Sequence, residues 1–128
     1  MITHVDNYLF SKKINTIDNE VLVKDCLDIE KKLLTTFPVI DKRFYGTLST
    51  AHHHEYNMLT FPAKEINKLY YELQSMICPY LEDRTYCIKS WLNVFRKGQK
   101  IDWHDHWPSK LKVWHGFYCV QVGKSYTE

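Results

Sequence analysis

The sequence predicts an α+β domain in which two helices pack on a mostly antiparallel sheet. Two stretches with helical spacing of apolar residues come first, and two stretches that alternate apolar and polar side chains follow them. Helices that precede strands, instead of alternating with them along the chain, are typical of α+β domains. The 128 residues suffice for one hydrophobic core and not for two, so we expect a single domain over residues 1–128.

The first part of the chain carries a weak strand pattern and a clear helical one. Residues 7–14 alternate apolar and polar side chains and predict a short first strand. Residues 16–34 place apolar side chains at three- and four-residue spacing among charged ones, so we expect an amphipathic helix there. Its apolar face is expected to carry Val21, Leu22, Cys26, Ile29 and Leu33. Thr16 or Asp18 would cap this helix, because a short oxygen side chain accepts hydrogen bonds from the free amides of the first turn.

A second helix and two extended stretches complete the pattern. The helix is expected to begin near Pro62, which suits a first helical position, and to end before Pro79. Residues 35–57 show no sustained period and are predicted to be irregular. The spacing then changes to period two, which predicts strands over residues 86–95 and 110–122. One face of the earlier strand is expected to carry Tyr86, Ile88, Ser90, Leu92 and Val94.

Composition and charge exclude several classes of protein. The 17 Lys and Arg residues nearly balance 15 Asp and Glu residues and are scattered, which argues against a nucleic-acid-binding surface. The sequence has no apolar run of membrane-spanning length and no signal-peptide pattern at its start, so we expect a cytoplasmic protein that is not a membrane protein. The four cysteines form no C-x-x-C pair and are expected to act as small, half-buried hydrophobes.

Two histidines one residue apart are the best candidates for chemistry. On an extended chain Asp102, His104 and His106 point to the same side. Two imidazoles and one carboxylate form the ligand set of non-haem iron(II) oxygenases. From spacing alone, surface or hydrogen-bonded histidines remain an alternative. For the cluster His52–His54 a solvated loop is the stronger interpretation, because adjacent residues do not share one face of a strand.

The histidine pair belongs to a longer pattern that continues on both sides. A Trp with an Asn two residues later precedes an Arg-Lys-Gly turn, the H-x-H, a Pro-Ser pair and a Gly-Phe-Tyr strand: Trp91, Asn93, Arg96, Lys97, Gly98, His104, His106, Pro108, Ser109, Gly116, Phe117 and Tyr118. This order resembles the 2-oxoglutarate- and iron(II)-dependent oxygenases, in particular a prolyl-hydroxylase-like group from phages and marine bacteria. The match covers about a quarter of the chain and is far more specific than H-x-H alone.

The resemblance implies a fold and a reaction. The fold would be a double-stranded β-helix, or jelly roll, of which residues 16–82 give the helical support and residues 85–122 the first strands. The cofactors would be iron(II) and 2-oxoglutarate, with Asn93 and Tyr118 as cofactor-binding residues and Trp91 lining the pocket. The reaction would be hydroxylation of a C–H bond in a substrate that the sequence does not identify.

The sequence departs from the family pattern in three places. The wider superfamily has H-x-D or H-x-E, whereas the residue two after His104 is His106, so either Asp102 supplies the carboxylate or the metal accepts two imidazoles from this strand. The chain after His106 is longer than in the phage group, which puts His115 where those proteins have a small residue. A distal histidine and a 2-oxoglutarate-binding Arg or Lys have no match before Glu128, so we expect an N-terminal part of the oxygenase, or one that a partner chain completes.

Two alternatives differ from this interpretation in their chemistry. The first is a non-catalytic α+β module whose aromatic face, from Trp91 to Tyr118, binds a partner or joins copies of the chain in a homo-oligomer. The second is a cupin-like metal enzyme that does not use 2-oxoglutarate and that needs further ligands. Iron binding separates the module from both enzymes, and the response to 2-oxoglutarate separates the two enzymes.

Overall fold

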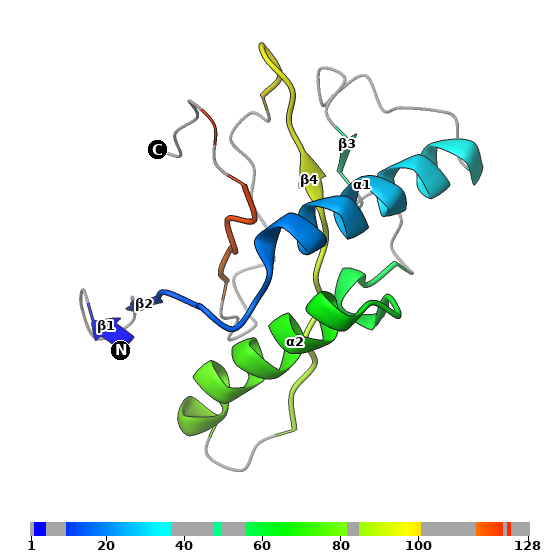
Figure 1. The fold of residues 1–128 in the computed structure, drawn as a ribbon. Coiled ribbons are helices and arrows are strands. Elements are labelled where there is room, and N and C mark those ends of the chain that lie inside the picture. The colour runs from blue at the N-terminus through cyan, green and yellow to red at the C-terminus, as the bar shows by residue number, and fades with distance from the viewer. Residues whose placement is uncertain are drawn as a thin grey trace.

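The computed structural model describes residues 2–4, 10–36, 48–49, 56–81, 85–100, 115–121 and 123. Its helices are α1 (Asn19–Thr36) and α2 (Lys64–Ile77), with the short 3-10 helices η3 (Met58–Thr60) and η4 (Cys78–Tyr80). Its strands are β1 (Ile2–His4), β2 (Phe10–Lys12), β3 (Leu48–Ser49) and β4 (Asn93–Val94). The chain from residue 85 to residue 100 passes behind both helices in the view of Figure 1.

Helix α1 forms where the spacing of apolar residues predicts a helix. The carboxylate of Asp18 accepts hydrogen bonds from the backbone N–H groups of Glu20 (3.1 Å) and Val21 (3.2 Å), so Asp18, not Thr16, is the cap. Val21 itself is exposed. The buried apolar face of α1 consists of Leu22, Cys26, Ile29 and Leu33. The predicted helix and its predicted buried face are therefore confirmed, except at Val21.

Helix α2 begins two residues after Pro62 and ends at Ile77, close to the predicted limits. Ile66 and Leu69 are buried, and Pro79 lies in η4, where its ring cannot continue the α-helix. Side chains from both helices and from Leu92 form one hydrophobic core, whose buried members are Ile17, Leu22, Cys26, Ile29, Leu33, Met58, Leu59, Ile66, Leu69 and Leu92.

Polar contacts join the segment before α1 to helix α2. Glu72 accepts a hydrogen bond from the ammonium group of Lys12 (2.7 Å) and another from the hydroxyl of Thr16 (2.7 Å). The Lys12 contact, and then the Thr16 contact, lower the pKa of Glu72 below its ordinary value. Glu65 accepts from the backbone N–H of Asp18 (2.9 Å), which places the start of α1 against the first turn of α2.

The prediction of a mostly antiparallel sheet that the helices cover, and with it the prediction of the first half of a jelly roll, is wrong. In the described ranges the strands form two separate antiparallel pairs, β1 with β2 and β3 with β4, and each pair has only two strands. The helices pack on each other and on the extended segment 85–100 instead of on a sheet. The expected first strand over residues 7–14 is represented by β2.

Hydrogen bonding explains why the period-two stretch does not build a sheet. The carbonyl of Ile88 accepts from the side-chain amide of Asn57 (2.8 Å), and the carbonyl of Ser90 accepts from the backbone N–H of Met58 (3.3 Å). The Ser90 hydroxyl also donates to the Asn57 side-chain oxygen (2.5 Å). These carbonyl groups already accept hydrogen bonds from η3 and its cap residue, so they are not available to pair with a neighbouring strand.

The alternation itself is nevertheless visible in the burial of this segment. Leu92 is buried and Ile88, Ser90 and Val94 are half-buried, whereas Tyr86 is exposed. Alternating burial requires only that an extended chain lies on an apolar surface. The period-two pattern therefore predicted the buried face, apart from Tyr86, but not the hydrogen-bonded sheet. In the later stretch residues 115–121 are described, without a strand, and residues 110–114 lie outside the described ranges.

Among the described residues no helix combines the length and the apolar character needed to cross a membrane.

Candidate functional site

The described residues include the flanks of the histidine pair but not the pair. Asp102, His104 and His106 lie outside them, and so does the cluster His52–His54. Within the described residues no group of three His, Cys, Asp or Glu side chains is placed to hold a metal ion. The three predicted metal ligands therefore stay a prediction, and the geometry of the site comes from what surrounds them.

On the upstream side a tight turn follows strand β4. The backbone N–H of Gln99 donates to the carbonyl of Arg96 (2.9 Å), and the backbone N–H of Arg96 donates to the side-chain oxygen of Gln99 (2.7 Å). Gly98 has a backbone φ of 84°, a conformation that residues with a Cβ atom rarely adopt. The predicted break after residue 95 is thus a closed turn, held by both the backbone and a side chain.

This turn is attached to helix α1 by a two-pronged ion pair. The two terminal nitrogens of Arg96 donate to the two carboxylate oxygens of Glu30, each at 2.6 Å. The side chain of Glu30 is only 7% exposed, whereas that of Arg96 is 55% exposed. The hydrogen bonds to Glu30 raise the pKa of Arg96 above its ordinary value. The pair joins the buried face of α1 to a turn 66 residues later in the sequence.

Sequence reasoning did not identify this pair, although a signal was present. Glu30 lies one helical turn after Cys26 and three residues before Leu33, and so on the apolar face of α1. A carboxylate on such a face is costly unless a cation pairs with it. The pattern therefore indicated a buried partner for Glu30 but not which of the basic residues supplies it.

On the downstream side, aromatic and polar contacts hold residues 115–121. The rings of Trp91 and His115 stack with centroids 6.0 Å apart and an interplanar angle of 27°. The hydroxyl of Tyr118 donates to the side-chain oxygen of Asn19 (2.8 Å), and burial raises the pKa of this hydroxyl. Asn93 lies exposed on β4. Of the two predicted cofactor-binding residues, the structure directs Tyr118 to helix α1 and leaves Asn93 at the surface.

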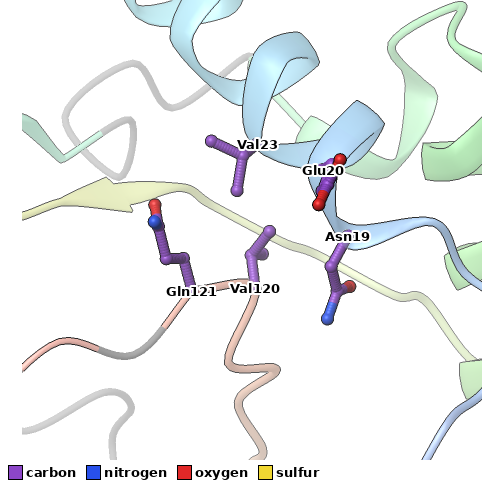
Figure 2. Close-up of a pocket in the computed structure, with 5 residues that line it drawn as sticks. All are labelled: Asn19, Glu20, Val23, Val120 and Gln121. Atoms are coloured by element: carbon purple, nitrogen blue, oxygen red, sulfur yellow. The ribbon is translucent and has the colours of Figure 1, made fainter.

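Close to Tyr118 the chain leaves a small hollow of about 280 Å³ at the start of α1. It is lined by Asn19, Glu20, Val23, Val120 and Gln121. Figure 2 shows Val23 and Val120 across from each other, with the polar ends of Asn19 and Gln121 on either side. Among these described residues Glu20 carries the one carboxylate, which offers too few donors for a metal site.

A second hollow, of about 500 Å³, lies between α2, η3 and the start of the extended segment. The described residues that line it are all uncharged: Asn57, Leu59, Thr60, Asn67, Tyr70, Tyr71, Tyr86 and Ile88. Within the described part of the chain it therefore offers no cationic side chain to pair with an anionic cosubstrate such as 2-oxoglutarate. Of the two predicted site residues that the structure describes, Asn93 and Tyr118, neither lines either hollow.

One buried thiol lies in the core, and three thiols are exposed. Burial, and to a lesser extent the charge of Asp25, raises the pKa of Cys26 to about 11 from an ordinary value of 9.0. Because the folded protein favours the neutral thiol, this contribution to the free energy of unfolding is complete below pH 9 and falls as the pH rises toward 11. The expectation of four half-buried cysteines is wrong: Cys26 is buried in the core, as a small hydrophobe, whereas Cys78, Cys87 and Cys119 are exposed.

We expect a disulfide reagent such as DTNB to separate these thiols by rate. At mildly alkaline pH the exposed Cys78, Cys87 and Cys119 should react within the mixing phase, and Cys26 only as fast as the protein unfolds. A Cys26→Ala variant should lose the slow phase alone. Rapid reaction of all four thiols in the folded parent would show that Cys26 is accessible and would contradict the prediction.

No protein-family model, curated protein or solved structure matches this chain. The resemblance of residues 91–122 to the oxygenases thus rests on the motif in the sequence.

Proposed function

We propose that this chain carries the metal-binding motif of a cytoplasmic iron(II)- and 2-oxoglutarate-dependent oxygenase of the hydroxylase type. His104 and His106 are the proposed metal ligands, and Asp102 is the candidate for the third. The observation that carries the proposal is the ordered pattern from Trp91 to Tyr118, because ten further residues of the family pattern occur in order around the histidine pair.

The chemistry of the donor set fits iron(II). Two imidazoles and a carboxylate with open coordination positions suit this ion better than magnesium or calcium, which prefer oxygen ligands alone. The bound iron and 2-oxoglutarate would supply the oxidation of a substrate C–H bond. His104 and His106 would have to be neutral to bind the metal, so metal affinity should fall as acid protonates them.

The flanks of the motif support the proposal in a second way. Two metal ligands bind well when the backbone holds both side chains in one fixed geometry. Rigid attachment of the residues on either side restricts the backbone in this way. Arg96 attaches the upstream turn to α1, and Tyr118 attaches the downstream segment to the start of the same helix. The exposed amide of Asn93 remains able to bind a carboxylate, whereas Tyr118 would have to exchange its bond with Asn19 for one with the cosubstrate.

Anaerobic calorimetric titration of the chain with iron(II), with and without 2-oxoglutarate, tests the proposal. We expect micromolar binding of iron(II) that becomes tighter when 2-oxoglutarate is present. Coupling between the two is reciprocal, so binding of either one raises the affinity of the site for the other. Magnesium, titrated in the same way, is the control and should give no heat of binding. No binding of iron(II), or equal heats with both metals, would contradict the proposal.

A second candidate function is the non-catalytic module with an aromatic interaction face. It is favoured by the exposure of two rings within the stretch from Trp91 to Tyr118, Phe95 at 50% and Phe117 at 75%. Large exposed aromatic side chains are typical of protein interfaces. Under this proposal the chain self-associates through that face, and Phe117→Ser shifts its mass in light scattering toward the monomer. A parent chain that is monomeric over the whole concentration range would contradict it.

A further inference from the structure

We propose that the hollow between α2, η3 and the start of the extended segment binds a neutral carbohydrate, a short chain of glucose-type pyranose rings. This tyrosine hollow has a volume of about 500 Å³, and its described lining residues are Asn57, Leu59, Thr60, Asn67, Tyr70, Tyr71, Tyr86 and Ile88. Pockets that bind small molecules have volumes of roughly 300–1,000 Å³, so its size fits such a ligand. The inference goes beyond the proposed oxygenase and does not rest on it.

The side chains of the tyrosine hollow favour a ligand that is polar but uncharged. Among its described lining residues two are aliphatic, Leu59 and Ile88, and the others carry amide or hydroxyl groups. A ligand with a phosphate or carboxylate group is best held by cationic side chains. Amides and hydroxyls instead pair with hydroxyl groups, and no charge has to be buried. This chemistry matches the many hydroxyl groups of a carbohydrate.

Two tyrosine rings of α2 form a corner of the tyrosine hollow. The ring centroids of Tyr70 and Tyr71 are 5.4 Å apart, and the ring planes are inclined at 69°. Tyr71 is 66% exposed, so most of its ring is open to contact. The face of an aromatic ring carries partial negative charge and attracts C–H bonds that neighbouring oxygen atoms polarise, such as those on the flat side of a glucose-type ring.

The angle between the two rings separates a sugar from a planar ligand. A flat nucleobase is typically held by stacking between side chains that lie parallel to it, and two rings at 69° do not provide this arrangement. A pyranose chair is thicker, and it can place its C–H side on one ring while its hydroxyl edge faces the other. The corner therefore fits a carbohydrate better than a nucleobase.

Asn67 supplies hydrogen-bonding groups beside the two rings. It precedes Tyr70 by three residues and Tyr71 by four, so the three side chains lie on one face of α2. Asn67 is exposed, and its amide offers two N–H donors and a carbonyl acceptor. Of two adjacent hydroxyl groups on a pyranose, one accepts from the amide while the other donates to it. One asparagine thus binds two hydroxyl groups at once.

Hydrogen bonds between its walls fix the shape of the tyrosine hollow. The side-chain amide of Gln74 donates to the hydroxyl of Tyr86 (3.0 Å), which joins α2 to the extended segment. The side-chain amide of Asn57 donates to the carbonyl of Ile88 (2.8 Å), which joins the cap of η3 to the same segment. A site whose walls are already in place loses less conformational entropy when a ligand binds.

NMR titration of the 15N-labelled chain with cellotriose and maltotriose tests the proposal. We expect saturable shifts of the Asn67 side-chain amide and of backbone amides in η3 and α2, with a dissociation constant of about 1 mM or lower. Sorbitol is the control ligand, because it carries the hydroxyl groups of glucose without the ring, and it should give no saturable shift. Adenosine, which is neutral and planar, tests the alternative of a nucleobase ligand.

Three variants locate the binding site, and a fourth is a matched control. Tyr71→Ala removes the exposed ring and should raise the dissociation constant about tenfold, whereas Tyr71→Phe keeps the ring and should bind within about twofold of the parent. Asn67→Ala removes the amide and should weaken binding about five- to tenfold. Tyr80→Ala removes a tyrosine of η4 that is not among the lining residues, and the affinity should stay unchanged.

Each outcome supports or overturns the inference, and none depends on iron. Saturable binding of a trisaccharide that Tyr71→Ala and Asn67→Ala weaken, and Tyr80→Ala does not, would support it. Absence of saturable shifts with both trisaccharides would overturn it. Equal affinity in the parent, Tyr71→Ala and Asn67→Ala would overturn it as well, because the sugar would then bind elsewhere. Saturable shifts of the same amides with adenosine alone would show that the ligand is not a carbohydrate.

Discussion

Replacing His104 or His106 by alanine is expected to weaken iron(II) binding by roughly a hundredfold or more, because even residues behind the ligands typically contribute ten- to a hundredfold to metal affinity. Each substitution removes one nitrogen donor and leaves a methyl group that cannot coordinate. The unfolding midpoint should hardly change, because under this proposal the two imidazoles serve the metal and not the apolar core. The measurement is anaerobic calorimetry on each variant, with circular dichroism to confirm the fold.

Two further variants sharpen this prediction. His53→Ala removes an imidazole from the cluster that we interpret as a solvated loop, and the affinity should then equal that of the parent. Asp102→Ala tests the third ligand: an intermediate loss would assign the carboxylate to Asp102. If His104→Ala, His106→Ala and the parent bind iron(II) equally well, the metal site at the histidine pair does not exist.

The helices could be predicted from the sequence because their signals are local. Asp18 lies within three residues of the amides that it caps, and the apolar face of α1 repeats within one or two turns. Such patterns specify a helix without knowledge of distant residues. The same is true of the turn at Gly98, where one flexible residue follows an alternating stretch.

The sheet could not be predicted correctly because its hydrogen bonds depend on distant residues. The alternation around Leu92 shows which side chains turn inward, but the partner of each backbone carbonyl is not encoded in that pattern. Asn57 lies 31 residues before Ile88, and its side-chain amide occupies a carbonyl that a neighbouring strand would have needed. A polar side chain outside the predicted strand therefore takes up a carbonyl that a sheet longer than the β3–β4 pair would have needed.

The candidate site also has a part that the sequence predicts and a part that depends on distant residues. The positions of the histidines follow from the motif, whereas the attachment of their flanks to α1 depends on two contacts between distant residues. Arg96 reaches Glu30 across 66 residues, and Tyr118 reaches Asn19 across 99. The unusual place of Glu30 on an apolar face was the only local sign of either contact.

The largest effect on stability is expected from Ile66→Ala. Ile66 is fully buried in α2, in the core that α1 and Leu92 share, so truncation removes apolar contacts and leaves a cavity. We expect the free energy of unfolding to fall by about 2–5 kcal/mol, as for other buried aliphatic residues cut back to alanine. Urea denaturation measures this change, with circular dichroism following the helices.

Tyr71→Ala is the matched control, because Tyr71 lies on the same helix but is 66% exposed. Its free energy of unfolding should stay close to that of the parent, since exposed substitutions usually change stability by no more than about 0.5 kcal/mol.

The comparison of the two variants also bears on the metal site. The extended segment that leads to His104 rests on this core through Leu92, so the Ile66 variant should lose iron(II) binding only to the extent that it unfolds. A loss of iron(II) affinity in fully folded Ile66→Ala would instead mean that the core sets the geometry of the ligands. Equal free energies of unfolding for Ile66→Ala and Tyr71→Ala would show that Ile66 does not support the core.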